Sequence, residues 1–70
     1  MSEHMDQLNS ILRQNNLRGA TAERIREAIL ENNRADVVRI IAGNAKGAER
    51  RRAEDIADEL FDALLGRFLA

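Results

Sequence analysis

The chain has 70 residues, is 44% hydrophobic and 33% charged, carries a formal net charge of −1, and contains no Cys, Pro, Trp or Tyr. This length allows one small domain, and the missing cysteines exclude a disulfide scaffold, a cysteine-ligated metal site and a cysteine nucleophile. No apolar run approaches the roughly 18 residues of a membrane span and no leader pattern opens the chain, so we expect a cytoplasmic protein.

A first helix is predicted from about Glu3 or Met5 to Asn15. Its apolar residues recur at the i, i+3, i+4, i+7 spacing of one helical face, and they are Met5, Leu8, Ile11 and Leu12. Asn15 and Asn16 suit the end of this helix, because Asn tolerates the left-handed backbone found there. One interpretation takes residues 1–4 as an expression remnant with the native chain beginning at Met5, and the other takes them as native.

A second helix follows a short connection over residues 17–20. Thr21 is expected to be its N-cap, with Glu23 well placed in the first turn. The residues expected to face inward are Ala22, Ile25, Ala28 and Ile29. The helix is predicted to end at Asn32 and Asn33, an ending that repeats the Asn pair of the first helix.

A third, short helix is capped by Asn33 or Asp36 and stops at Gly43 and Asn44. It holds the most hydrophobic stretch of the chain, with Val37, Val38, Ile40 and Ile41. Branched side chains are mediocre helix formers, so burial must hold this segment in place.

The longest element is predicted from about Ala45 to Leu69, either as a separate helix or joined to the third one through Gly43. Its apolar residues fill an arc of roughly 180°, whereas packing against one neighbour needs little more than about 100°. The excess width asks for a second neighbour, and we expect a second copy of the chain to supply it. The expected partner or dimer interface consists of Ile56, Leu60, Phe61, Leu64, Leu65, Phe68 and Leu69. For Phe61, Leu65 and Leu69 the alternative is a place in the core of the chain itself.

Charge is unevenly distributed along this last element. The segment from Lys46 to Arg52 sums to +3, and the five acids that follow it sum to −5. A basic cluster in the first turn of a helix opposes the helix dipole. The arginines Arg50, Arg51 and Arg52 are therefore candidate contacts for phosphate or for an acidic partner, and the candidate docking face is formed by Asp55, Asp58, Glu59 and Asp62.

Few residues of this chain could carry out catalysis. The nucleophiles and bases other than carboxylates are Ser2, His4, Ser10, Thr21 and Lys46. No spacing brings a nucleophile to a tuned base, and the glycines form no phosphate-binding loop after a strand. We expect no enzyme, no catalytic residue, no metal and no cofactor.

Short likenesses to two families fall on the same stretch. Arg51–Glu54 with Leu60–Asp62 resembles a segment of the small nucleoid-associated modulators, and Ala57–Phe61 with Leu65 is similar to the end of a dimeric helical bundle that binds paired RNA loops. Each covers less than a quarter of the chain. Because two unrelated families fit one amphipathic helix, the likeness reflects amphipathicity, and the sequence is assigned to neither.

The sequence predicts an all-α single domain over residues 1–70, a bundle of three to four helices with a long C-terminal helix, forming a homodimer. The predicted function is that of a small regulator or adaptor that binds a protein partner. The alternatives are a nucleic-acid-binding regulator that uses Arg50–Arg52, and a purely structural oligomerisation domain. Ten arginines against one lysine are typical of a GC-rich genome, and we expect a bacterial or phage-like protein.

Overall fold

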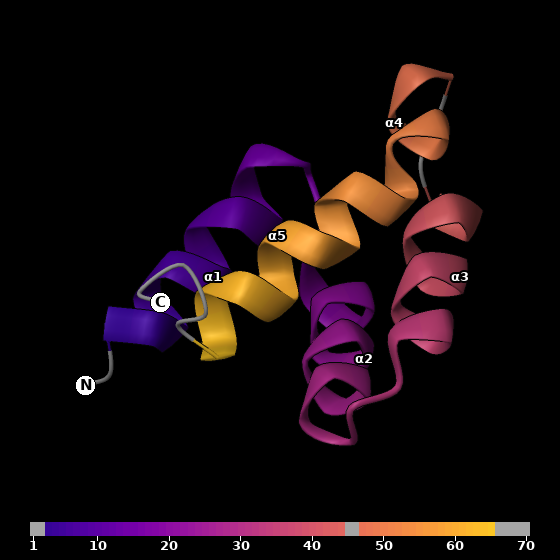
Figure 1. Cartoon of the computed structure of the whole chain (residues 1–70). Helices are drawn as coiled ribbons and strands as arrows, with labels where there is room; N and C mark the ends of the chain where they lie inside the picture. Colours follow the sequence, from indigo (N-terminus) through magenta and orange to yellow (C-terminus); the bar gives the residue numbers. More distant parts are fainter. Residues whose placement is uncertain (1–2, 45–46, 66–70) are drawn as a thin grey trace.

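The computed structural model describes residues 3–44 and 47–65, and this part of the chain is helical without a strand (Figure 1). Its helices are α1 (Glu3–Gln14), α2 (Gly19–Leu30), α3 (Arg34–Asn44), the single-turn α4 (Ala48–Arg51) and α5 (Ala53–Leu65). The predicted all-α class is confirmed. None of the described helices combines the length and the apolar character needed to cross a membrane.

The last full helix, α5, holds the bundle together. It packs against α1 and α3, while α3 also contacts α2 and α4 (Figure 1). The radius of gyration is 11.1 Å, close to the roughly 11 Å that a folded domain of this length is expected to have. A single chain therefore reaches the density of a folded domain.

Each of the four longer helices contributes apolar side chains to one core. The sequence predicted the inward faces of α1, α2 and α3, and the buried residues follow that prediction: Leu8, Leu12, Ala22, Ile25, Ala28, Ile29, Val37, Ile40 and Ile41. From α5 the core receives Ala53, Ile56, Ala57, Leu60 and Phe61. Met5, Ile11 and Val38 are only partly buried at its edge.

Helices α1 and α2 end in the same way. Asn16 and Asn32 adopt left-handed backbone with φ of 60° and 58°, as the paired asparagines of the sequence predicted. After α1, the Leu17 N–H donates to the Leu12 carbonyl at 2.8 Å and the Asn16 N–H to the Arg13 carbonyl at 3.0 Å. This is the Schellman arrangement, which satisfies carbonyls that the helix leaves unpaired.

The start of α2 differs from the prediction. Thr21 is not the N-cap, because the helix begins at Gly19 and the capping position is Arg18, whose side chain makes no capping hydrogen bond. Gly19 has φ of +61°, a conformation that costs little only for glycine. The flexibility of Gly19 allows the helix to start three residues earlier than a polar cap at Thr21 indicated.

The predicted helix over residues 45–69 is divided. Within the described residues, α4 ends at Arg51 and α5 starts at Ala53 and runs for 13 residues. The break places Arg50 and Arg51 in the last turn of α4 and Glu54 and Asp55 in the first turn of α5. Both placements suit the helix dipole, so the break relieves the conflict that one continuous helix beginning at the arginines would create.

Candidate interaction surfaces

The apolar arc of α5 faces the core of its own chain. Ile56 and Leu60 are fully buried and Phe61 is 6% exposed. Leu64 is partly buried at the edge of the same core. The side chain of Leu65, together with Phe68 and Leu69, lies outside the described residues.

The second neighbour that the width of this arc required is therefore present within one chain. Helix α5 packs against both α1 and α3 (Figure 1). At Ile56, Leu60 and Phe61, burial needs no second copy of the chain. Leu64 is the one residue of the predicted dimer interface that the structure describes at the edge of the core.

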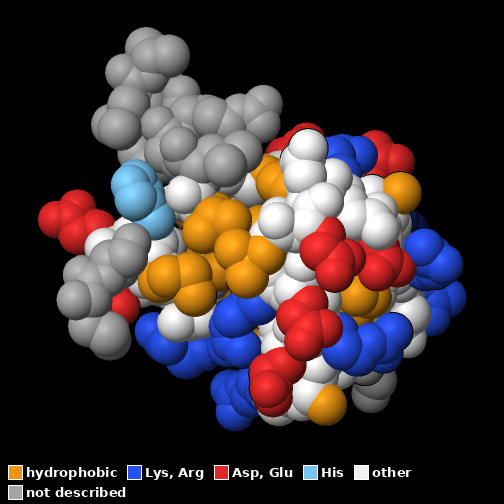
Figure 2. All heavy atoms as spheres, turned by 90° about the horizontal axis from the view of Figure 1, so that it is seen from below, with side chains coloured by type: hydrophobic (Ala, Val, Ile, Leu, Met, Phe, Trp, Pro, Cys, Tyr) orange, Lys and Arg blue, Asp and Glu red, His pale blue; other side chains and the backbone are white. Residues whose placement is uncertain are grey.

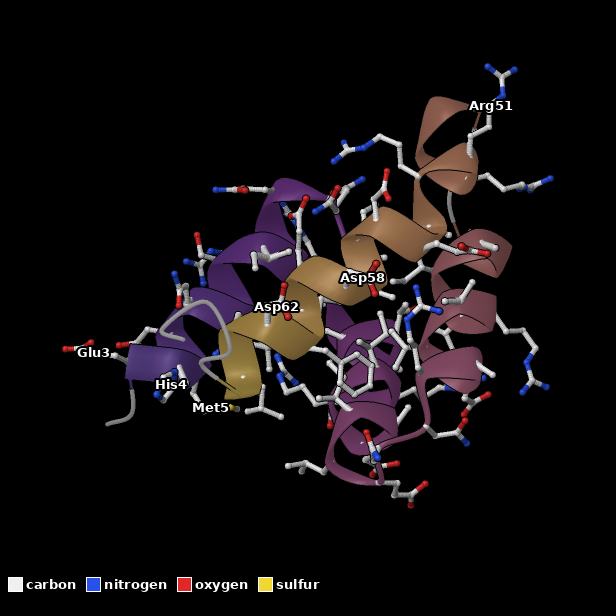
Figure 3. The ribbon with its side chains drawn as sticks, viewed as in Figure 1. Glu3, His4, Met5, Arg51, Asp58 and Asp62 are labelled. Carbon is white, nitrogen blue, oxygen red and sulfur yellow. The ribbon has the colours of Figure 1, made fainter. Side chains whose placement is uncertain are left out.

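The acidic residues of α5 lie on the opposite side of the helix, where Asp55, Asp58, Glu59 and Asp62 are exposed. Figure 3 shows the carboxylates of Asp58 and Asp62 projecting from α5 one turn apart. The structure thus brings the predicted docking face together as one continuous exposed surface, which we call the acidic face.

Two carboxylates of the acidic face pair with arginines from other segments. The Arg34 Nε, at the start of α3, lies 2.9 Å from the Asp58 Oδ1, and the Arg34 Nη2 donates to the Glu54 carbonyl at 3.4 Å. The hydrogen bond to Asp58, reinforced by the charges of Asp58 and Glu54, raises the pKa of the Arg34 guanidinium above its ordinary value. Arg52 Nη2 and Glu59 Oε2 form a looser pair at 3.6 Å.

The three arginines of the predicted cluster are exposed and lie in different surroundings. Arg50 donates from Nε to the Ala42 carbonyl of α3 at 3.2 Å, and Arg52 pairs with Glu59. Arg51 points away from the body of the molecule (Figure 3). The chain itself thus engages two of the three guanidinium groups, one with a backbone carbonyl and one with a carboxylate.

Near the other end of α5, His4 is half-buried and its Nδ1 lies 3.1 Å from the Ala63 carbonyl oxygen, joining α1 to α5. Beside the His4 side chain, hydrophobic side chains gather on the face seen in Figure 2, with basic side chains along one edge. Across the described residues, no group of three or more His, Asp or Glu side chains could hold a metal ion.

Sequence reasoning missed a basic hollow between α1 and α2. It has a volume of about 460 Å³ and is lined by Asn9, Leu12, Arg13, Leu17, Arg18, Gly19, Ala22 and Arg26. Its three arginines come from the end of α1, the connection and the second turn of α2, so no local cluster in the sequence signals it. Only the turn at residues 15–18, which reverses the chain, brings them around one opening.

Comparisons of the chain with protein-family models, curated proteins and solved structures give no match. A functional assignment therefore depends on the geometry of its own residues.

Proposed function

We propose that this chain is a cytoplasmic, non-enzymatic interaction module, a small regulator or adaptor that binds a basic segment of a protein partner through its acidic face. One observation carries the proposal: Asp55, Asp58, Glu59 and Asp62 are all exposed on one side of α5, while the other side is buried in the core. The surface that α5 offers to a partner is therefore its charged side.

The cost of this charge arrangement supports a binding role. On α5, Asp55 lies four residues before Glu59, and Asp58 four residues before Asp62, so like charges face one another. Each such pair costs a few tenths of a kcal/mol in an isolated helix. The chain compensates part of this with Arg34 and Arg52, and a basic partner would add further positive charge beside these carboxylates. Complementary charge of this kind speeds association and selects the partner.

The decisive experiment is affinity capture with the full chain, followed by titration of the captured partner. Asp55→Lys and Asp62→Lys are the informative variants, since neither disturbs the pairs at Asp58 and Glu59. We expect both to weaken the complex while circular dichroism shows unchanged helicity. Glu27→Lys is the matched control, because Glu27 is an exposed acid of α2 away from the acidic face. Equal affinity of Asp55→Lys and the unmodified chain would refute the acidic face as the docking surface.

The proposal includes self-association, through fewer residues than the sequence predicted. With Ile56, Leu60 and Phe61 buried within the monomer, a homodimer would use Leu64, Leu65, Phe68 and Leu69. Sedimentation equilibrium at micromolar concentration distinguishes the two states, with Leu64→Glu as the variant. A dimer that Leu64→Glu converts to a folded monomer supports the proposal, whereas a stable monomer of the unmodified chain contradicts it.

A further inference from the structure

The basic hollow between α1 and α2 combines an apolar floor with a positively charged rim. Leu12, Leu17 and Ala22 are buried beneath it. Arg13 and Arg18 are exposed at the rim and Arg26 is half-buried. The hollow lies within the range of roughly 300–1,000 Å³ that is typical of small-molecule sites.

Among the described residues, no carboxylate forms an ion pair with the arginines around this hollow, although three other arginines have one. No carboxylate lines the hollow either. Exposed arginines need no partner, but three of them around one opening create a local field that attracts anions.

One of the three guanidinium groups is also held in position. The Arg26 Nε donates to the Asn9 Oδ1 at 3.1 Å across the gap between α2 and α1. This bond occupies the inner nitrogen of Arg26 and leaves the two terminal nitrogens for a ligand. A fixed guanidinium loses less side-chain entropy on binding, and its planar fork matches the oxygens of a phosphate.

The backbone adds donors at the same place. Gly19 lines the hollow and is the first residue of α2, and the first N–H groups of a helix have no acceptor within it. At α2 the side chain of Arg18 makes no capping hydrogen bond, and no acid lies in the first turn. The helix end thus reinforces the field of the arginines.

The geometry points to a binding site for a small organic phosphate monoester, with its phosphate on the rim formed by Arg13, Arg18 and Arg26 and its organic group within the hollow above Leu12, Leu17 and Ala22. A small ligand fits better than a nucleic-acid backbone, which needs a track of positive charge. This chain has a net charge of −1 and exposes its acids along α5 instead.

Amide NMR of the full-length chain tests this site with phenyl phosphate as the probe, at constant ionic strength. We expect saturable shifts of the Gly19 and Ala22 amides. Inorganic phosphate should shift the same amides with weaker affinity, and phenol should not. Arg18→Gln and Arg26→Gln should each weaken phenyl phosphate binding by about tenfold or more, the effect of losing a hydrogen bond to a charged group.

The matched control is Arg24→Gln, since Arg24 is an exposed arginine of α2 that does not line the hollow. It should change the affinity by less than about twofold, an effect of net charge alone. The site is refuted if the shifts do not saturate, if phenol binds as well as phenyl phosphate, or if Arg24→Gln weakens binding as much as Arg26→Gln. If a single-stranded oligonucleotide shifts these amides while phenyl phosphate and inorganic phosphate do not, the small-ligand proposal is wrong and the ligand is a nucleic acid. None of these results depends on the acidic face.

Discussion

Arg34 and Asp58 join the start of α3 to the middle of α5 across 24 residues of sequence, with the Nε and Oδ1 atoms 2.9 Å apart. Both side chains are about half exposed, at 46% and 59%. The same guanidinium reaches the Glu54 carbonyl, so one side chain binds two successive turns of α5. The pair fixes the position of α3 beside the acidic face and takes one of its carboxylates.

The exposure of this pair predicts a small contribution to stability that depends on salt. Asp58→Asn should lower the melting temperature slightly at low ionic strength, and the difference should shrink at high salt as the charges are screened. The hydrogen bond to Asp58 and the charges of Asp58 and Glu54 raise the pKa of Arg34, so while Asp58 is ionised the contribution is lost only as the pH rises through that raised pKa. A double-mutant cycle with Arg34→Gln measures the coupling, and a coupling that is independent of salt would contradict this account.

Leu60 should be among the residues on which folding depends most. It is fully buried, and truncating a buried Leu to Ala costs about 2–5 kcal/mol. A 70-residue domain has roughly 4–10 kcal/mol of stability in total, so Leu60→Ala should remove a large share of it. Leu30→Ala is the control, since Leu30 is 73% exposed and its loss should change stability by less than about 0.5 kcal/mol. Urea denaturation measures both. A mild effect of Leu60→Ala would indicate that the core is not closed as the structure shows.

Gly19 and Gly43 should respond in opposite directions to substitution by Ala. No atom lies within 4 Å of a Cβ built at either position, but Gly19 has φ of +61°. Gly19→Ala should therefore destabilise by about 1–2 kcal/mol, the cost of left-handed backbone for an L-residue. Gly43 lies within α3 with ordinary helical φ, and Gly43→Ala should stabilise by about 0.4–1 kcal/mol. Thermal unfolding of the two variants measures both changes in stability. If both variants change stability in the same direction, the left-handed backbone at Gly19 is contradicted.

Asn33 should stabilise the start of α3 through its side chain. The Asp36 N–H donates to the Asn33 Oδ1 at 3.2 Å, a capping bond whose loss costs about 1 kcal/mol. Asn33→Ala should show this loss in chemical denaturation. Asn33→Ser keeps an acceptor oxygen at the cap and should retain most of the stability. If Ser and Ala have the same effect, the side-chain bond is not the stabilising feature.

Local chemistry predicted much of the fold. The spacing of apolar residues placed the inward faces of α1, α2 and α3, and the asparagine pairs marked two helix ends, because both signals act within a few residues. The start of α2 was mispredicted because a polar residue that resembles a cap competes with a glycine that can adopt positive φ. The break at Arg52 suits the sign of the charges on its two sides. The sequence shows a conflict with the helix dipole in this segment but does not locate the break.

What the sequence by itself determined is the helical class, the inward faces of α1 and α2 and the segregation of acids on one side of the last helix. These follow from periodicity, which is a property of each helix alone. Only the tertiary structure decided that α1 and α3 share the wide apolar arc of α5, so that Ile56, Leu60 and Phe61 are buried within one chain. Tertiary structure likewise gathered Arg13, Arg18 and Arg26 around one hollow. Both outcomes depend on where the connections direct each helix, and that direction is set by the packing of the whole core rather than by any single segment.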